Sequence, residues 1–415
     1  MTTGSAVRRL SAWDAERLRG LADEYDTPLY VYDLERVREN AARLQDAFDE
    51  EEISYAVKAN TTRPVLSTIE ATGVGAECAS AGEVERALAA GFDGEDVRYT
   101  AVNPPARDLD YVVDAAADED LIVTVGAADT LDQLAERGFS GRLCIRANPG
   151  VGAGHHEKVS TGAAPKFGVP LDRVPDLAAE AADRGFDLVG LHAHAGSGIS
   201  GEDLQAHREL VARMGELARR VISDVGSIEF VNVGGGLGVP YREGEDPLDL
   251  DAVASATRDA FGDVDAELGI EPGRYFVADA GVLLTRVNTV KPTPETTVVG
   301  VDAGMTTLVR PAMYDSYHAI RSLVPDAAER ESVSATVAGP ICETADVLGE
   351  DRPLPDPERD DLLAVGNAGA YGYEMSSNYN SRPRPAVVAL DGNDARLAVR
   401  REAVADITEL ETWSE

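Results

Sequence analysis

The sequence contains almost no lysine. Only four of its 415 residues are lysines, and the other 34 of its 38 basic residues are arginines. Acidic residues number 74, which gives a formal net charge of −36, and they recur along the whole chain rather than in one tail. No basic cluster is present to face phosphates, so we expect no nucleic-acid partner. Spread acid with scarce lysine predicts a surface adapted to concentrated salt and a halophilic, archaeal source; an acidic mesophilic protein is the alternative.

Cysteine and long apolar runs are also scarce. The three cysteines, Cys78, Cys144 and Cys342, are widely spaced and form no CxxC pair, which argues against a disulfide framework and against a zinc site. The first 18 residues have no apolar signal core, and no apolar run approaches the roughly 18 residues that span a membrane. We therefore expect no membrane association and a cytoplasmic location.

Short apolar runs alternate with alanine-rich, charged, helix-like stretches from about residue 50 onward. Eight runs are candidate strands: Ile53–Ala59, Gly75–Ala79, Val97–Val102, Leu121–Val125, Arg142–Asn148, Leu188–His194, Ile228–Val233 and Leu268–Glu271. Two of the helix-like stretches, residues 81–92 and 128–139, end in Gly-Phe, where the glycine suits a helix C-cap. Eight strands alternating with helices predict an α/β protein with a (β/α)₈ TIM barrel; a doubly wound open sheet is the alternative.

The alternation stops near residue 280. Runs of β type follow, separated by turn residues, which predicts a second, mainly antiparallel β domain. The early run Leu29–Tyr32 precedes the barrel and is a candidate strand of that second domain. We therefore expect a barrel over residues 35–280, and a β-rich domain formed by residues 1–34 and 281–415.

Active sites of such barrels lie at the carboxyl ends of the strands. Five of the predicted strands end in residues that suit catalysis or phosphate binding: Lys58, Glu77 in GAECAS, His192, His194 and Ser197 in HAHAGSG, Gly234, Gly235 and Gly236 in VGGGLG, and Glu271 and Arg274 in EPGR. Each alone is weak evidence, because a lysine, a triple glycine or a histidine is often structural. Together they predict one functional rim.

These residue types match one cofactor. An uncharged lysine amine can form a Schiff base with an aldehyde. Glycine-rich strand-to-helix turns let backbone N–H groups approach a phosphate, with a helix N-terminus adding a favourable dipole. An imidazole can stack on an aromatic ring, and a carboxylate can keep a ring nitrogen protonated. An aldehyde, a phosphate and a pyridine nitrogen together describe pyridoxal 5′-phosphate.

Two other site types are less well supported. VGGGLG is not a GxGxxG fingerprint followed by an acidic partner, so the signal for a dinucleotide is weak. His192 and His194 alternate along a predicted strand and should point to opposite faces, so we expect no metal site and interpret His192 as structural.

Eight ordered blocks resemble one enzyme family. YAVKAN, GAECAS, HAHAGSG, NVGGGLGVPY, EPGR, DAGMTTLVRPAMYDSYH, GPICETAD and GNAGAYGYEMSSNYN are similar to the blocks of diaminopimelate decarboxylases, which belong to the alanine-racemase-like group of pyridoxal-phosphate enzymes. The resemblance covers about residues 25 to 390, and the last three blocks separate these decarboxylases from racemases. It implies decarboxylation of meso-2,6-diaminopimelate to L-lysine, the final step of that route of lysine biosynthesis.

The resemblance also implies roles for single residues. It implies that Lys58 carries the cofactor and that His194 stacks on its ring. The phosphate is bound by Ser197, Gly235, Gly236 and the segment Glu271, Pro272, Gly273 and Arg274, within which Glu271 pairs with the ring nitrogen.

For the substrate, the resemblance implies that Arg274, Arg310 and Tyr314 bind the distal carboxylate. Glu343 reads the distal amine, and Tyr371 touches both cofactor and substrate. Cys342 is the proton donor after carbon dioxide leaves. Cys342 and Glu343 reach the site from a partner subunit, so the active unit is a homodimer with shared active sites.

Arginine suits a substrate with a second carboxylate, because its planar fork can bind both oxygens. Ornithine lacks that carboxylate, so LVRPAMY favours diaminopimelate over ornithine, arginine or carboxynorspermidine as substrate. A non-catalytic carrier or regulator that binds the cofactor is a further alternative, although it would not need a substrate clamp. One departure from the family is Gly198, where a glutamine is expected; the roles of Lys158 and Lys166 stay open.

Overall fold

A computed structural model describes residues 6–154, 164–197, 199 and 204–412 of the chain. These residues form two compact units, and the chain crosses between them more than once. The first unit comprises Met1–Val37, Pro240–Pro247 and Val277–Glu415, and the second comprises Arg38–Val239 and Leu248–Phe276. Gly198 and Lys158 lie outside the described residues.

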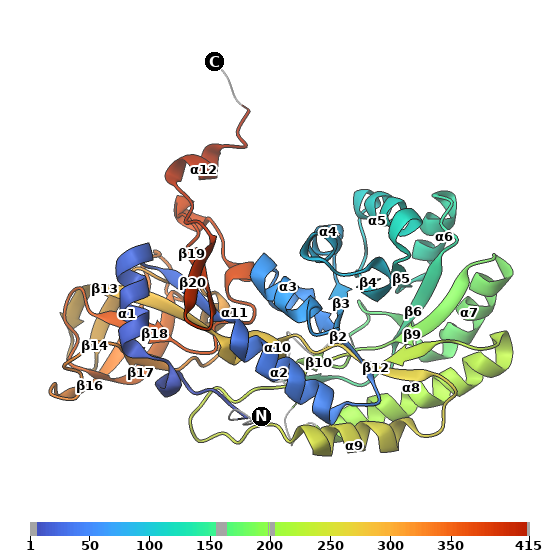
Figure 1. The fold of residues 1–415 in the computed structure, drawn as a ribbon, viewed down its shortest axis with the longest axis horizontal. Coiled ribbons are helices and arrows are strands. Elements are labelled where there is room, and N and C mark those ends of the chain that lie inside the picture. The colour runs from blue at the N-terminus through green and yellow to red at the C-terminus, as the bar shows by residue number, and fades with distance from the viewer. Residues whose placement is uncertain (1–5, 155–163, 198, 200–203, 413–415) are drawn as a thin grey trace. The chain divides into compact units, whose positions relative to one another are not determined.

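The second unit is a closed barrel of eight parallel strands, as the alternating pattern predicted (Figure 1). The strands are β2 (Glu52–Ala56), β3 (Gly75–Cys78), β4 (Val97–Tyr99), β5 (Ile122–Val125), β6 (Arg142–Asn148), β9 (Asp187–His192), β11 (Phe230–Asn232) and β12 (Glu267–Ile270). Strand β12 pairs with β2 and β5 pairs with β6, so the sheet closes on itself and the open-sheet alternative is wrong. The short strand β8 (Val169–Pro170) pairs in parallel with the end of β6, and β7 (Ala153–Gly154) pairs with β10 (Gly196–Ser197).

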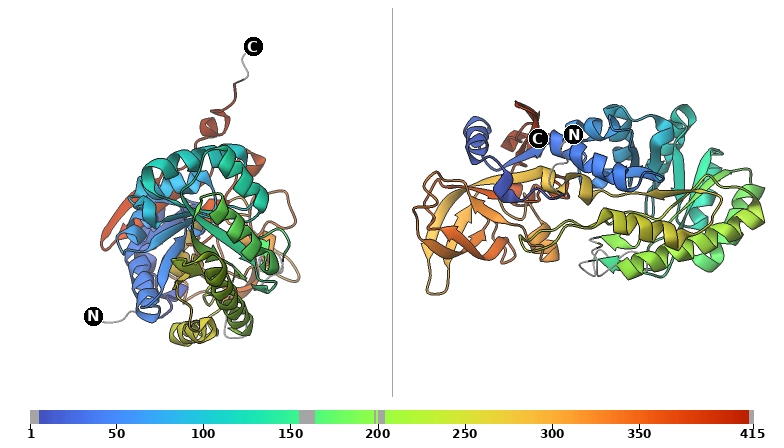
Figure 2. Two further views of the ribbon diagram at one scale, coloured as in Figure 1. Left: turned by 90° about the vertical axis from the view of Figure 1, so that its right-hand side faces the viewer. Right: turned by 60° about the horizontal axis from the view of Figure 1, so that its bottom comes forward.

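Helices lie outside the ring of strands (Figure 2). They are α2 (Leu34–Ala47), α3 (Arg63–Glu70), α4 (Ala81–Ala90), α5 (Ala106–Glu119), α6 (Ala128–Glu136), α7 (Val174–Asp183), α8 (Leu204–Val225), α9 (Leu250–Phe261) and the single-turn α10 (Arg274–Val277). Helix α4 shows why these stretches are helical. Ser80 accepts a hydrogen bond from the Glu83 N–H at its start, and Gly91 ends it with φ of +115°, as the Gly-Phe signal predicted.

Each barrel strand is short and buried on both faces. All four residues of β3 and of β5 are buried, because parallel strands are covered by helices outside and by side chains inside. Most of the predicted strands end one to three residues later than the observed ones. The difference matters for Lys58, which lies in a 3₁₀ turn, Val57–Ala59, directly after β2 rather than on the strand itself.

The first unit is mainly antiparallel β structure. Its strands are β1 (Leu29–Asp33), β13 (Gly281–Pro292), β14 (Thr297–Val301), β15 (Ile320–Ser322), β16 (Ser332–Ala338), β17 (Val347–Pro355), β18 (Leu362–Val365), β19 (Ala386–Asp391) and β20 (Asp394–Val399), and its helices are α1 (Ala15–Tyr25), α11 (Arg310–Tyr314) and α12 (Val404–Thr408). Strand β1 pairs antiparallel with β13 and parallel with β19, so the early run does join this sheet as predicted. A core around Trp13, Leu29, Val31, Leu284 and Val388 holds the sheet to α1.

Candidate active site

Lys58 forms an ion pair with Glu77. The two come from neighbouring strands: Lys58 follows β2, and Glu77 lies on β3 opposite Ala56. The Glu77 side chain is only 3% exposed, whereas that of Lys58 is 39% exposed. Burial raises the pKa of Glu77, and the nearby ammonium of Lys58 opposes that rise. The pair therefore holds a lysine amine at the carboxyl end of the strands, with its charge balanced by a buried acid.

Glu271 is the second buried acid of this rim, and two imidazoles approach it. Its Oε1 atom lies 3.0 Å from Nε2 of His192 and 3.8 Å from Nδ1 of His194. The prediction that the two histidines point to opposite faces is wrong, because β9 ends at His192 and the strand alternation ends with it. Burial opposes ionisation of Glu271, but the charge and hydrogen bond of His192, followed by the charge of Lys58, lower the pKa of that carboxyl.

His194 is held in its neutral form. Burial lowers the pKa of His194 well below its usual value, and its Nδ1 accepts a hydrogen bond from the Gly235 N–H at 3.2 Å. This hydrogen bond fixes Nδ1 as the acceptor and therefore leaves the proton on Nε2. The site thus presents an uncharged aromatic ring beside the carboxylate of Glu271.

The triple glycine lets backbone approach backbone. A Cβ on Gly235 would stand 2.1 Å from the Glu271 carbonyl oxygen, and one on Gly236, where φ is +84°, would stand 2.3 Å from the Gly196 carbonyl oxygen. No helix begins at this turn, since α9 starts only at Leu250, so the expected helix dipole is absent there. The Gly234 and Gly235 N–H groups donate to Asn232 Oδ1 and His194 Nδ1, so the Gly236 N–H is the donor of the triple glycine that can face a phosphate.

The EPGR segment closes the same side of the rim. The carbonyl of Pro272 accepts a hydrogen bond from the Ala56 N–H at 3.3 Å, and a Cβ on Gly273 would stand 3.0 Å from the Cβ atoms of Ala56 and Ala59. Arg274 donates from Nη2 to the Ser197 hydroxyl at 3.1 Å. The segment thus lies tightly against the turn that carries Lys58, with a cation and a hydroxyl side by side.

These residues fit pyridoxal 5′-phosphate. The Oε2 atom of Glu271 is buried and has no hydrogen-bond partner among the described residues, so it can accept the N–H of a protonated ring nitrogen. Lys58 offers a primary amine, and Ser197 and Arg274 offer phosphate donors beside the glycine turn.

One buried cation was missed by the sequence reasoning. Arg146 lies on β6, is 7% exposed, and packs with Cζ 5.3 Å from the Phe167 ring centroid. Burial lowers the pKa of this arginine, while the charges of Glu271 and Glu77 raise it. The rim therefore balances two acids, Glu77 and Glu271, with two cations, Lys58 and Arg146. The position of Arg146 near the carboxyl end of the fifth predicted strand is the signal that could have identified this residue.

The other predicted residues belong to the β-rich unit. Arg310 opens helix α11, is 3% exposed, and has the rings of Tyr241, Tyr314 and Tyr371 within 5.8–5.9 Å of its Cζ atom. This distance is within the range of cation–π attraction. Tyr241 was not predicted as a site residue, although it ends the NVGGGLGVPY block. The three rings frame a guanidinium whose fork suits a carboxylate.

Cys342 and Glu343 lie on the loop between β16 and β17 and are both exposed. Tyr379 donates its hydroxyl proton to Glu343 Oε1 at 2.5 Å, and Asn380 Nδ2 lies 3.5 Å from Cys342 Sγ. The structure thus brings this thiol and carboxylate together with residues 379 and 380.

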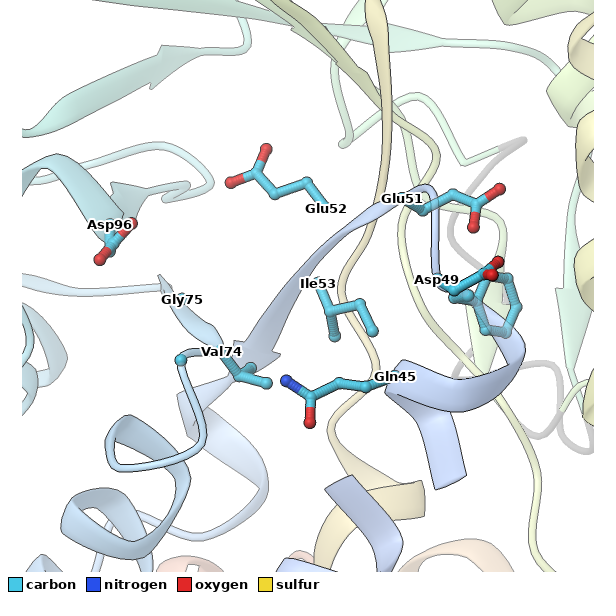
Figure 3. Close-up of a pocket in the computed structure, with 10 residues that line it drawn as sticks. Gln45, Asp49, Glu51, Glu52, Ile53, Val74, Gly75 and Asp96 are labelled. Atoms are coloured by element: carbon cyan, nitrogen blue, oxygen red, sulfur yellow. The ribbon is translucent and has the colours of Figure 1, made fainter. Parts of the chain in front are cut away.

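A separate pocket of about 290 Å³ opens at the other end of the barrel (Figure 3). Its lining residues are Gln45, Phe48, Asp49, Glu51, Glu52, Ile53, Gly73, Val74, Gly75 and Asp96. Glu52 and Gly75 are the first residues of β2 and β3, so the pocket lies at the amino ends of these strands. Catalytic sites of TIM barrels lie at the carboxyl ends, and this pocket is therefore not the candidate active site.

Within the part of the chain that the structure describes, no helix is both long enough and apolar enough to cross a membrane.

Comparison with known families and proteins gives a consistent result. Residues 34–278 match the family model for the pyridoxal binding domain of pyridoxal-dependent decarboxylases. The chain is 43% identical to a diaminopimelate decarboxylase from Methanothermobacter thermautotrophicus over 402 residues, which cover 93% of this chain and 92% of the relative. It is 37% identical to a diaminopimelate decarboxylase from Escherichia coli K12 over 418 residues, covering 96% of each.

Solved structures agree with the described fold. Diaminopimelate decarboxylase from Helicobacter pylori, complexed with L-lysine, matches with a TM-score of 0.88 at 32% identity, over 95% of this chain and 99% of that one. The enzyme from M. jannaschii in co-complex with L-lysine also matches with a TM-score of 0.88, at 30% identity, over 99% of this chain and 97% of that one.

Proposed function

This chain belongs to the diaminopimelate decarboxylases within the pyridoxal-dependent decarboxylases, and from that premise we propose that it converts meso-2,6-diaminopimelate to L-lysine and carbon dioxide. Its cofactor is pyridoxal 5′-phosphate. The observation that carries the proposal is the rim itself. A lysine amine, a neutral imidazole and a glycine turn occur there with a buried carboxylate, one oxygen of which has no hydrogen-bond partner among the described residues.

The bound cofactor supplies a conjugated, protonated ring that takes up the electron pair left on the substrate carbon when carbon dioxide departs. Lys58 would hold the cofactor through its primary amine, the group that can react with an aldehyde. Glu271 holds the proton on the ring nitrogen, and His192 keeps that carboxylate ionised and oriented. His194 offers an uncharged ring for stacking, which adds no second positive charge beside the cofactor.

We assign phosphate binding to the glycine turn, where Gly236 supplies a backbone N–H and Gly235 donates its own N–H to His194, together with the Pro272–Gly273 segment, the Ser197 hydroxyl and Arg274. Support comes from the pairing of the Ser197 hydroxyl with the Arg274 guanidinium at 3.1 Å and from the close backbone packing that Gly235 and Gly236 permit at this turn. Backbone donors and a guanidinium are suited to a phosphate dianion.

Substrate recognition follows from charge. We assign the distal carboxylate to Arg310 and Arg274, with Tyr314 and Tyr371 at its sides, and the distal ammonium to Glu343. Support for Arg310 comes from its burial beside the rings of Tyr314 and Tyr371, where its planar guanidinium suits a carboxylate. Ornithine would bring no second carboxylate to this cation.

Proton delivery is assigned to Cys342. After the bond to the carboxylate breaks, the thiol donates its proton to the same carbon, and solvent then reprotonates the sulfur. We infer that Cys342 and Glu343 act in the site of a second copy of the chain, so that the enzyme is a homodimer. Support comes from their exposure in the single chain, where a thiol and a carboxylate with these roles are open to solvent.

The acidic surface supports a halophilic source, and the three free cysteines support a reducing, cytoplasmic location. Repulsion within a chain of net charge −36 is screened over about 10 Å in 0.1 M salt but over about 3 Å in 1 M salt. We therefore expect the midpoint of thermal unfolding to rise with potassium chloride, more than it rises in sucrose of equal osmolality. Equal effects of the two solutes would contradict salt adaptation.

The proposed activity is tested by adding substrates to the cofactor-loaded protein in concentrated salt. We expect release of carbon dioxide and L-lysine from meso-diaminopimelate, and none from ornithine or arginine. Lys58→Ala should abolish turnover and the visible absorbance of covalently bound cofactor, while Lys291→Ala, at an exposed strand position, should change neither. Release from ornithine without release from diaminopimelate would disprove the assignment.

A further inference from the structure

Residues 379–382 contact the loop of Cys342 and Glu343 at three successive points. Tyr379 donates to Glu343 Oε1 at 2.5 Å, Asn380 Nδ2 donates to Cys342 Sγ at 3.5 Å, and Arg382 Nη2 donates to the Pro340 carbonyl at 3.3 Å. Each step forward along one segment is a step back along the other. The two segments therefore run antiparallel, and their side chains meet in register.

The base of the same loop is fixed by a buried acid. The Asp346 carboxylate accepts the N–H of Ile341 at 2.6 Å and that of Met305 at 2.5 Å. A Cβ on Gly304 or Gly339 would stand 2.4–2.5 Å from the Asp346 oxygens, so these backbones pack directly against the carboxylate. Asp346 thus fixes where the loop leaves the sheet, while the orientation of its exposed thiol and carboxylate depends on the contacts at its tip.

The backbone of the 379–382 segment explains how two adjacent side chains reach two adjacent targets. Asn380 and Ser381 have φ of +57° and +52°, in the left-handed region. Asparagine enters this region more readily than most residues, and glycine enters it without cost. The turn gives the segment its direction, and the amide of Asn380 supplies the contact to sulfur.

We propose that Tyr379 and Asn380 are positioning residues of the decarboxylase, with Asn380 orienting the Cys342 thiol and Tyr379 orienting the Glu343 carboxylate. This inference rests on the proposed function, which assigns proton delivery and ammonium recognition to that thiol and that carboxylate. An amide N–H donor to sulfur favours the thiolate that remains after proton transfer. The Tyr379 hydroxyl occupies Oε1 of Glu343 and leaves Oε2 for a substrate ammonium.

The reactivity of the Cys342 thiol can be measured separately from that of the other two cysteines. Cys78 and Cys144 are buried, and burial raises the pKa of both thiols, so Cys342 is the exposed cysteine available to a small reagent. Alkylation of the cofactor-loaded, full-length protein by iodoacetamide, followed by mass spectrometry, therefore measures one sulfur. This readout does not depend on turnover.

The test compares Asn380→Gly and Asn380→Asp with Ser381→Gly. Glycine and aspartate can both adopt the left-handed backbone conformation of residue 380. Asn380→Gly deletes the side-chain amide, and Asn380→Asp replaces the N–H donor by an anion. At about pH 7.5 we expect Asn380→Gly to slow alkylation of Cys342 by about threefold or more, and Asn380→Asp to slow it further. The control Ser381→Gly should be alkylated at the wild-type rate.

Unchanged alkylation in both Asn380 variants, or equal slowing in Ser381→Gly, would overturn the role of the amide. For the carboxylate, Tyr379→Phe should raise KM for diaminopimelate by about threefold or more while kcat stays within about twofold. An unchanged KM would overturn that role. A wild-type protein that does not decarboxylate diaminopimelate would instead refute the proposed function, and the alkylation series would still decide whether Asn380 controls the thiol.

Discussion

The charges at the rim of the barrel are balanced residue by residue. Two buried acids, Glu77 and Glu271, are matched by Lys58 and Arg146, while His194 is kept neutral by burial. Isolated buried charges would be costly, and pairing lowers that cost. The Lys58 side chain stays partly exposed, and the Oε2 atom of Glu271 has no hydrogen-bond partner among the described residues.

At Arg310 the structure predicts that shape matters more than charge. Arg310→Lys keeps the cation but loses the planar fork and its contact with three tyrosine rings. We expect KM for diaminopimelate to rise by about tenfold or more, with a smaller change in kcat. Steady-state kinetics measure both. Arg107→Lys, at a side chain that is 89% exposed, is the matched control. A variant at Arg310 with unchanged KM would show that the distal carboxylate binds elsewhere.

At the scale of single elements, the turn after β11 depends on glycine. Gly236→Ala would place a Cβ 2.3 Å from the Gly196 carbonyl oxygen, at a φ of +84°. We expect a loss of about 2–4 kcal/mol in the free energy of unfolding, together with loss of bound cofactor. Urea unfolding and cofactor absorbance measure the two effects. Gly244→Ala meets no atom within 4 Å and should change neither. Cofactor retention in Gly236→Ala would contradict the assigned phosphate turn.

The contact between α8 and α9 predicts a pH dependence of stability. His207 is buried on α8, its Nε2 atom lies 2.8 Å from the Thr257 hydroxyl on α9, and burial lowers its pKa to about 4. The unfolded chain, with an ordinary histidine pKa near 6.5, binds this proton more readily. The stability that neutral His207 contributes is therefore fully present above about pH 6.5 and is lost as the pH falls towards about 4.

We expect that lowering the pH from about 7 to about 5 reduces the free energy of unfolding of the wild type by about 2 kcal/mol more than that of His207→Gln, because glutamine cannot take up the proton. Chemical denaturation at the two pH values measures this difference. The comparison between the two proteins cancels the contributions of other titrating groups. Equal losses in both would show that His207 is protonated in the folded protein.

At the scale of the whole molecule, the shared sites of the proposed dimer can be tested by mixing two inactive variants. Lys58→Ala lacks the amine, and Cys342→Ala lacks the thiol while it keeps its cofactor. In random pairing, half of the dimers are hybrids, and each hybrid has one complete site. We therefore expect recovery to about a quarter of the wild-type activity after co-refolding or exchange.

Activity assays of the mixture against each variant alone measure that recovery. Lys58→Ala mixed with a Lys58→Ala, Cys342→Ala double variant provides the control, because no complete site can form. Absence of recovery, with hybrid dimers demonstrated by native mass spectrometry, would place both groups in the same chain's site.

Much of the fold was predictable because apolar periodicity reflects local and repeated interactions. The eight strands of the barrel and the strand formed by Leu29–Asp33 in the β-rich unit were all found in the sequence. The strand ends were less accurate. Lys58 and His194 were both assigned to strands, and both lie just beyond one, where the chain leaves the hydrogen-bonded ladder. Exact ends depend on pairing partners that are distant in the sequence.

The sequence by itself determined the type of fold, the type of cofactor and the residues at the rim, because strand alternation and ordered motifs are recorded in consecutive positions. The tertiary structure decided which of these residues meet. It paired Lys58 with Glu77, brought both His192 and His194 to Glu271, and placed Asn380 beside Cys342. Such contacts join segments up to 79 positions apart, as in the hydrogen bond between His192 and Glu271. Their distances and burial exist only after the barrel closes and the β sheet forms.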